Sequence, residues 1–125
     1  MKQVLVTGAT GFIGIEVSRQ LAARGLKPRL MVRRPLRGIM LKNLDVGIVQ
    51  ADLRSPRSLS RALDGVDTII HLGARAAFEP YQRLYPSIVQ GSLNLMQAAV
   101  NAGVQQMVYG GSLLVYADNP RGIDQ

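Results

Sequence analysis

Three glycines spaced three residues apart, Gly8, Gly11 and Gly14, separate an apolar run from a helical pattern. Residues 2–7 (KQVLVT) are typical of a short strand, and apolar residues recur at helical spacing over 12–24. In this context Gly8 permits a tight turn, Gly11 leaves room for a pyrophosphate beside the backbone, and Gly14 allows close packing of helix on sheet. The motif therefore predicts a dinucleotide-binding α/β fold rather than a plain connecting turn.

The rest of the chain continues the alternation of strand and helix. Each apolar, β-branched-rich run is followed by a helical pattern, a glycine or a proline. This order indicates βαβ units, and hence a parallel sheet with right-handed crossovers and helices on both faces. We expect strands at 28–33, 47–50, 67–72 and 106–109, helices at 12–24, 55–63 and 87–101, a helical turn at 39–44 and a loop at 73–86.

Composition excludes several kinds of site. The chain has no cysteine and one histidine, so it holds no disulfide, no thiolate metal site and no metal site that needs two imidazoles. No apolar run approaches the ~18–20 residues that cross a bilayer, and the N-terminus is typical of a strand rather than a signal peptide. We expect a cytoplasmic protein with no metal and no membrane partner.

Charge is concentrated in the N-terminal half. Residues 1–61 hold 12 of the 15 Lys and Arg but only 3 of the 8 Asp and Glu. Such a segment implies an anionic partner. Nucleic acid is not the expected one, because aromatic residues are few and no nucleic-acid motif is present. The phosphates of a cofactor fit the glycine turn better.

The end of the second predicted strand bears on which cofactor binds. Dinucleotide sites that bind NAD usually place an acid about 20 residues past the glycines, where it holds the ribose 2′-hydroxyl. Here Arg33 and Arg34 occupy that place, 19 and 20 residues after Gly14. A guanidinium matches the oxygens of a 2′-phosphate, which favours NADP, with NAD as second choice. The alternative is a pair of solvated arginines.

The segment VTGATGFIG resembles the TGxxGxxG fingerprint of the extended and atypical short-chain dehydrogenase/reductases, the NAD(P)-dependent epimerase/dehydratase family. Further segments resemble motifs of that family in the same order: QADL, DTIIHLGA, GSLNL and VYGGSLLVY, at 50–53, 67–74, 91–95 and 108–116. The resemblance implies a Rossmann-like, doubly wound sheet of strand order 3-2-1-4-5, truncated relative to the family. Residues 1–125 would be a partial NAD(P)-binding domain, without the catalytic-helix and substrate region.

The resemblance also implies site residues. Asp52 would meet the adenine ring, although a helix-entry acid is the alternative, and Ser112 aligns with the catalytic hydroxyl. His71 lies inside an apolar strand, so we expect it to be structural. The expected cofactor contacts are Thr7, Gly8, Thr10, Gly11, Phe12, Ile13, Gly14, Arg33, Arg34, Asp52, Leu53, Leu72, Gly73 and Ala74.

One part of the family pattern is missing. Its proton relay pairs a tyrosine with a lysine four residues later, which lowers the phenol pKa for general-base work. None of the tyrosines, Tyr81, Tyr85, Tyr109 and Tyr116, has such a lysine, and Ile88 stands where an Asn is common. We therefore expect the NADP-binding portion of an oxidoreductase or epimerase that is inactive alone, its substrate bound only with the missing part.

A second hypothesis is a non-catalytic NADP(H)-binding sensor or assembly module, which would also lack the tyrosine and lysine. Under either hypothesis, the fifth strand is left as an open sheet edge by the absence of the family's later strands. Open edges pair readily with other chains, so we expect self-association through this edge.

Overall fold

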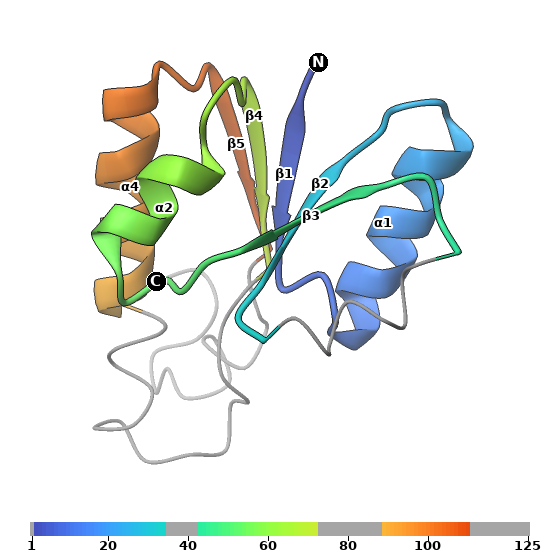
Figure 1. Ribbon diagram of the computed structural model, residues 1–125, viewed down its shortest axis with the longest axis horizontal. Coiled ribbons are helices and arrows are strands. Elements are labelled where there is room, and N and C mark those ends of the chain that lie inside the picture. Colours follow the sequence, from blue (N-terminus) through green and yellow to red (C-terminus); the bar gives the residue numbers. More distant parts are fainter. Residues whose placement is uncertain (1, 35–42, 73–88, 111–125) are drawn as a thin grey trace, which may run out of the picture.

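The computed structural model of the chain describes residues 2–34, 43–72 and 89–110. Their strands form one five-stranded parallel sheet in the order β3-β2-β1-β4-β5 (Figure 1). The predicted strand order is therefore confirmed. The strands are β1 (Val4–Thr7), β2 (Arg29–Val32), β3 (Gly47–Gln50), β4 (Thr68–His71) and β5 (Gln106–Tyr109).

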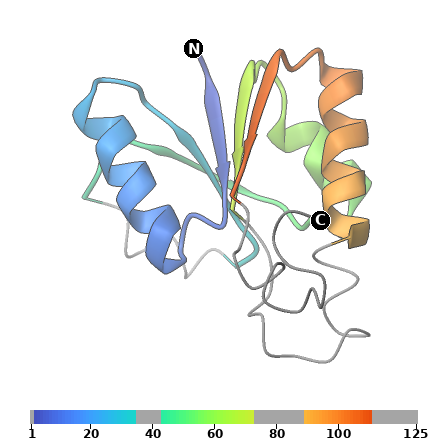
Figure 2. The same ribbon diagram turned by 180° about the vertical axis from the view of Figure 1, so that it is seen from behind.

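Helices cover both faces of the sheet. Helix α1 (Phe12–Ala23) lies on one face, and α2 (Pro56–Ala62) and α4 (Gly91–Ala102) lie together on the other (Figures 1 and 2). This is the doubly wound arrangement expected from the alternating elements. Among the described residues, no helix is long and apolar enough to cross a membrane.

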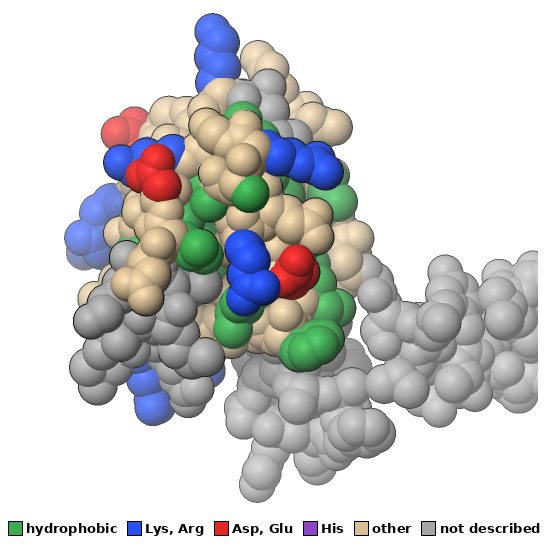
Figure 3. Space-filling model, turned by 90° about the vertical axis from the view of Figure 1, so that its right-hand side faces the viewer, with side chains coloured by type: hydrophobic (Ala, Val, Ile, Leu, Met, Phe, Trp, Pro, Cys, Tyr) green, Lys and Arg blue, Asp and Glu red, His purple; other side chains and the backbone are tan. Residues whose placement is uncertain are grey.

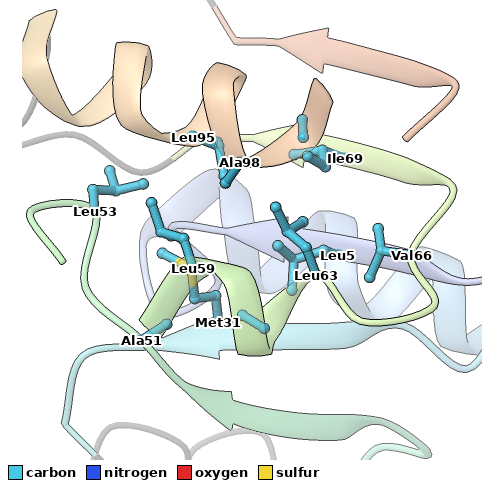
Figure 4. Packing of buried hydrophobic residues seen from close by; sticks show 12 residues of the cluster. Leu5, Met31, Ala51, Leu53, Leu59, Leu63, Val66, Ile69, Leu95 and Ala98 are labelled. Atoms are coloured by element: carbon cyan, nitrogen blue, oxygen red, sulfur yellow. The ribbon is translucent and has the colours of Figure 1, made fainter. Parts of the chain in front are cut away.

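The core divides according to which way each strand residue points. Leu5 faces the α2 and α4 layer, while its neighbours Val4 and Val6 face α1, as the two-residue period of a strand requires. Figure 4 shows the larger cluster, in which strand, loop and helix side chains interlock. Its fully buried members include Leu5, Leu59, Leu63, Ile69 and Leu95.

The element ends differ slightly from those expected. Ser55 precedes α2 as its N-cap, and its hydroxyl accepts the Ser58 N–H at 3.3 Å. Gly103 ends α4 at φ +77°, a left-handed conformation that glycine adopts without strain. The helical turn expected at 39–44 and the loop expected at 73–86 lie largely or wholly outside the described residues, as does the start of the helix expected at 87–101.

The carboxyl ends of the parallel strands meet at one edge of the sheet. In register, Thr7 of β1 lies beside His71 of β4, and His71 lies beside Tyr109 of β5. The connection that leaves β1 leads to β2 on one side of it, whereas the connection that leaves β3 leads to β4 on the other side of β1. This edge is therefore the topological switch point, where open α/β sheets bind ligands.

Candidate dinucleotide site

The glycine turn places an uncapped helix start at this edge. Gly8 adopts φ +70°, and its carbonyl accepts the Gly11 N–H at 3.1 Å, which closes the turn. Gly11 is the N-cap of α1 and offers no side-chain hydrogen bond, and the first turn contains no acidic residue. The first backbone N–H groups of α1 are thus not satisfied by a side-chain cap, and they carry the positive end of the helix dipole.

The other two glycines serve different purposes. A Cβ at Gly14 would lie 1.9 Å from the Gly8 carbonyl oxygen and 2.9 Å from the Cα of Ala9, so only glycine lets α1 lie this close to the turn. The close approach is to the turn that follows β1, whereas the sequence predicted close packing of the helix on the sheet. A Cβ at Gly11 would meet only the Gly8 oxygen, at an ordinary 3.4 Å. Contacts within the described chain do not require glycine at Gly11, whereas a phosphate approaching the helix start would.

The two residues that open α1 project into solvent. The Phe12 side chain is 95% exposed and that of Ile13 is 63% exposed. Any contact they make with a phosphate at the helix start would therefore use their backbone N–H groups. Figure 3 shows the face that α1 covers, with basic side chains scattered over it and a few acidic ones among them.

Arg33 and Arg34 directly follow β2 at the same sheet edge, and both are exposed. The ion pairs among described residues join Glu16–Arg19, Lys27–Asp45 and Asp52–Arg54, so neither arginine is used in one. The Gln50 side-chain amide donates to the Arg33 carbonyl at 3.3 Å, which ties the end of β2 to β3. Both guanidinium groups are thus available to an anion.

Asp52 follows β3 and is held by its neighbour Arg54. The Asp52 Oδ1 accepts the Arg54 N–H at 2.9 Å and its Nε–H at 3.2 Å, while Oδ2 accepts from Nη2 at 2.9 Å. The side-chain hydrogen bond from Arg54 is the main cause that lowers the pKa of Asp52, against the opposing effect of burial, and the charge of Arg33 adds to it. Asp52 therefore carries a negative charge at neutral pH and lies near Arg33.

Hydrogen bonds to α2 and α4 hold the backbone around Asp52. The Asp52 backbone N–H donates to the Ser58 hydroxyl of α2 at 3.0 Å, while Ser55 rather than Asp52 is the N-cap of that helix. The Leu53 side chain is buried in the core, and its carbonyl accepts the Asn94 amide of α4 at 2.9 Å. The sequence predicted no role for Asn94, and only its place in the GSLNL segment could have indicated one.

At the ends of β1 and β4, His71 forms a contact that the sequence did not predict. Its Nδ1 lies 2.7 Å from the Thr7 hydroxyl and its Nε2 lies 3.0 Å from the Ser92 hydroxyl of α4. The ring is 3% exposed, and burial lowers its pKa. The Leu72 N–H donates to the Thr7 hydroxyl at 2.9 Å. His71 is buried, as expected of a structural residue.

Three of the predicted site residues, Gly73, Ala74 and Ser112, lie outside the described residues, so the structure places neither the end of the β4 motif nor the aligned hydroxyl. Within the described part of the chain, no three His, Asp or Glu side chains cluster as metal ligands would. The turn residues, Arg33, Arg34, Asp52, Leu53 and Leu72 all follow the carboxyl ends of strands, at the same edge of the sheet.

Strand order, helix layers and the glycine turn define a Rossmann-type dinucleotide-binding fold. Residues 4–125 match the family model of the NAD dependent epimerase/dehydratase family. The chain belongs to this family, and it corresponds to the nucleotide-binding Rossmann portion of NAD-dependent oxidoreductases and epimerases.

Known relatives support this assignment. The chain is 39% identical over 120 residues to Sterol demethylase protein B of Methylococcus capsulatus, covering 94% of this chain and 37% of that protein. It is 32% identical over 133 residues to a 3 beta-hydroxysteroid dehydrogenase/Delta 5-->4-isomerase of Mycobacterium tuberculosis, covering 98% and 35%. The chain thus spans little more than a third of the length of either relative.

A solved structure gives the same fold with the nucleotide in place. A mutant of uronate dehydrogenase from Agrobacterium tumefaciens, crystallised with NAD, superimposes with a TM-score of 0.77 at 30% identity. The match covers 90% of this chain and 41% of that one. Binding of a nicotinamide dinucleotide is therefore a property of the family and of this structural neighbour.

Proposed function

We propose that the chain is the NADP-binding portion of a short-chain-type oxidoreductase or epimerase that transfers hydride to or from a carbonyl or sugar-like substrate. The observation that carries the proposal is the junction of Gly11 and α1. A helix start without a side-chain cap lies beside a glycine that no described contact requires. This combination suits a pyrophosphate.

Each part of the nucleotide has residues that suit it. The α1 N–H groups, with Gly8, Thr10 and Gly11 around them, would hold the pyrophosphate. Asp52 and the Leu53 backbone would meet the adenine. Thr7, Leu72, Gly73 and Ala74 would lie at the nicotinamide end. When bound, the nicotinamide supplies the hydride chemistry, and the protein supplies position and electrostatics.

Arg33 and Arg34 support NADP over NAD. Both are exposed, and neither is used in an ion pair of the described chain. Charge-assisted hydrogen bonds to a 2′-phosphate are stronger than neutral ones. The uronate dehydrogenase structure holds NAD, so NAD is the cofactor expected if these arginines do not contact the ligand.

A fluorescence titration with NADPH and with NADH at one fixed salt concentration tests this proposal. We expect NADPH to bind more tightly, and the double variant Arg33→Ala/Arg34→Ala to lose about ten- to a hundredfold in NADPH affinity while NADH affinity changes little. Arg57→Ala/Arg61→Ala removes the same charge from exposed positions of α2 and is the matched control. Equal losses in the two double variants would refute a 2′-phosphate site.

The alternative is a non-catalytic NADP(H)-binding sensor or assembly module. It would apply if the whole protein, like these 125 residues, holds no tyrosine followed four residues later by a lysine. Ser112 alone would orient a carbonyl without moving protons efficiently at pH 7. Coding sequence that continues in frame past Gln125 with a Tyr-x-x-x-Lys would support the enzyme. A stop codon there, with nucleotide binding retained, would support the sensor.

The proposal also includes the chain's partners and location. The β5 strand has exposed Val108 and Tyr109 side chains, 48% and 55%, and ends the described sheet. Self-association through this edge would bury them, whereas a clean monomer at high concentration in light scattering would contradict it. A cytoplasmic location is supported by the absence of cysteine, and neither nucleic acid nor membrane is proposed as a partner.

A further inference from the structure

The buried imidazole of His71 joins three elements at the topological switch point. Thr7 ends β1 and His71 ends β4, and the two residues are in register in adjacent strands. The Nδ1 contact to the Thr7 hydroxyl crosses between these strands, and the Nε2 contact reaches Ser92 near the start of α4. These hydrogen-bonding partners lie 64 and 21 residues away in sequence.

Residues next in the chain to this contact belong to the candidate site. Thr7 leads directly into the Gly8 turn, and its hydroxyl accepts the N–H of Leu72, the first residue after β4. The Leu72 N–H also lies 3.2 Å from the Thr7 carbonyl oxygen. The backbone at the carboxyl ends of β1 and β4 is therefore linked to the His71 ring through Thr7.

We propose that His71 is a positioning residue for the nicotinamide half of the bound nucleotide. It fixes the end of β4 and the start of α4 relative to the glycine turn, and it touches no reacting atom itself. The inference rests on the proposed function, because it names the part of the nucleotide that this edge of the sheet would hold. The adenosine half, expected beside Asp52 just after β3, is separated from His71 by two intervening strands, β2 and β1.

Burial of the ring lowers the pKa of His71 and so favours its neutral form. A neutral imidazole has one N–H donor and one acceptor nitrogen, and each hydroxyl can both donate and accept, so both contacts are satisfied at once. The groups facing the ring are the Thr7 hydroxyl from β1, the Ser92 hydroxyl from α4 and the Tyr109 ring from β5, whose centroid is 5.3 Å away. No ion pair of the described residues includes His71, so no carboxylate compensates a buried positive charge.

The ring can be observed directly because His71 is the only histidine in the chain. Nitrogen-15 NMR of the imidazole in the nucleotide-free chain should show a largely neutral ring at pH 6.5, the ordinary histidine pKa. A ring that is half charged at that pH, as a solvated histidine is, would overturn the proposal. This measurement needs no nucleotide.

Comparing the affinities for two ligands distinguishes a positioning role of His71 from a general loss of structure. We expect His71→Gln and Ser92→Ala to weaken NADPH binding about five- to tenfold, while the affinity for adenosine 2′,5′-bisphosphate, the adenosine half alone, changes less than about twofold. Ser60→Ala, an exposed serine of α2, is the control for Ser92→Ala. Equal weakening of both ligands, or of neither, would overturn the proposal.

The pH profile supplies a second readout. In the wild type, NADH affinity should fall as the pH drops below the ordinary histidine value of 6.5, and in His71→Gln it should stay level over the same range. NADH is the ligand here because the 2′-phosphate of NADPH itself titrates near pH ~6. Identical profiles in the two proteins would contradict a role for the neutral ring. Wild-type chain that binds neither NADPH nor the bisphosphate would refute the proposed function and this inference together, whereas wild-type binding that the variants do not alter would refute the inference alone.

Discussion

Gly14→Ala should destabilise the fold more than any other alanine substitution in the turn. The added Cβ would lie 1.9 Å from the Gly8 oxygen, 2.7 Å from the Gly8 carbonyl carbon and 2.9 Å from the Ala9 Cα. All three are backbone atoms of the turn, so no flexible side chain can move aside. To restore the 3.0 Å that real Cβ contacts respect, α1 must withdraw by about 1 Å.

That withdrawal loosens α1 on its side of the sheet. The cluster there joins Leu21 of α1 to Val4, Val6 and Leu30 of the strands, so a shift of the helix start strains a packed layer. Overpacking costs about 1–3 kcal/mol, and contact with fixed backbone favours the upper end, about 3 kcal/mol. For a chain of this length, that corresponds to a fall in Tm of about 10 °C.

Thermal and urea unfolding followed by circular dichroism measure this loss. Gly11→Ala is the matched control, because its Cβ lies at 3.4 Å from the same oxygen and the Gly11 φ of −78° suits any residue. We expect Gly11→Ala to stay within about 1 kcal/mol of the wild-type free energy of unfolding. A Gly14→Ala chain as stable as Gly11→Ala would show that α1 does not pack against the turn as described.

Three further predictions concern the scaffold. Ser55→Ala removes the N-cap of α2 and should lower the free energy of unfolding by about 1 kcal/mol in urea titrations. Arg29→Met removes the guanidinium that donates to the carbonyls of Ala62 and Asp64 at the end of α2, at 2.8 and 2.7 Å. The free energy of unfolding should fall by about 1.5 kcal/mol, and an unchanged urea midpoint would refute this stabilisation of the α2 C-terminus by Arg29. The Thr68 hydroxyl and the Lys2 and Gln3 N–H groups lower the pKa of Asp67 below its ordinary 3.8, so Asp67 stabilises the fold above that pH and the effect is lost as pH falls. Asp67→Asn should therefore flatten the acid dependence of the urea midpoint below pH ~4, and parallel curves would contradict this.

Backbone features were predictable from the sequence. Strand order, the two helix layers and the need for glycine at Gly14 follow from periodicity, turn residues and the family resemblance. The alternation of strands and helices follows from which residues are apolar and where the chain must turn, both properties of local sequence, whereas the strand order was implied by the resemblance. The end of α4 was predictable to within one residue, at 101 against the observed Ala102.

Side-chain contacts were not predictable. The bonds of His71 to Thr7 and Ser92 depend on strand register and on where α4 lies, neither of which a single segment reveals. Asp52 was expected at the adenine or at a helix entry, and the structure adds its bond to Arg54, which depends on the conformation of the Arg54 side chain. The motif alone predicted Phe12 as a site residue. Because its ring is exposed, only its backbone N–H is expected to contact a phosphate.

The central claim is that the start of α1 binds the pyrophosphate of a nicotinamide dinucleotide. Calorimetric titration of the folded 125-residue chain with NADPH, beside Gly11→Ala of equal stability, tests it most directly. We predict saturable binding at one site per chain in the wild type and at least a tenfold loss in Gly11→Ala, because the Cβ enters the space of the phosphate. Absence of saturable binding in a folded wild-type chain, or equal affinity in both proteins, would contradict the account.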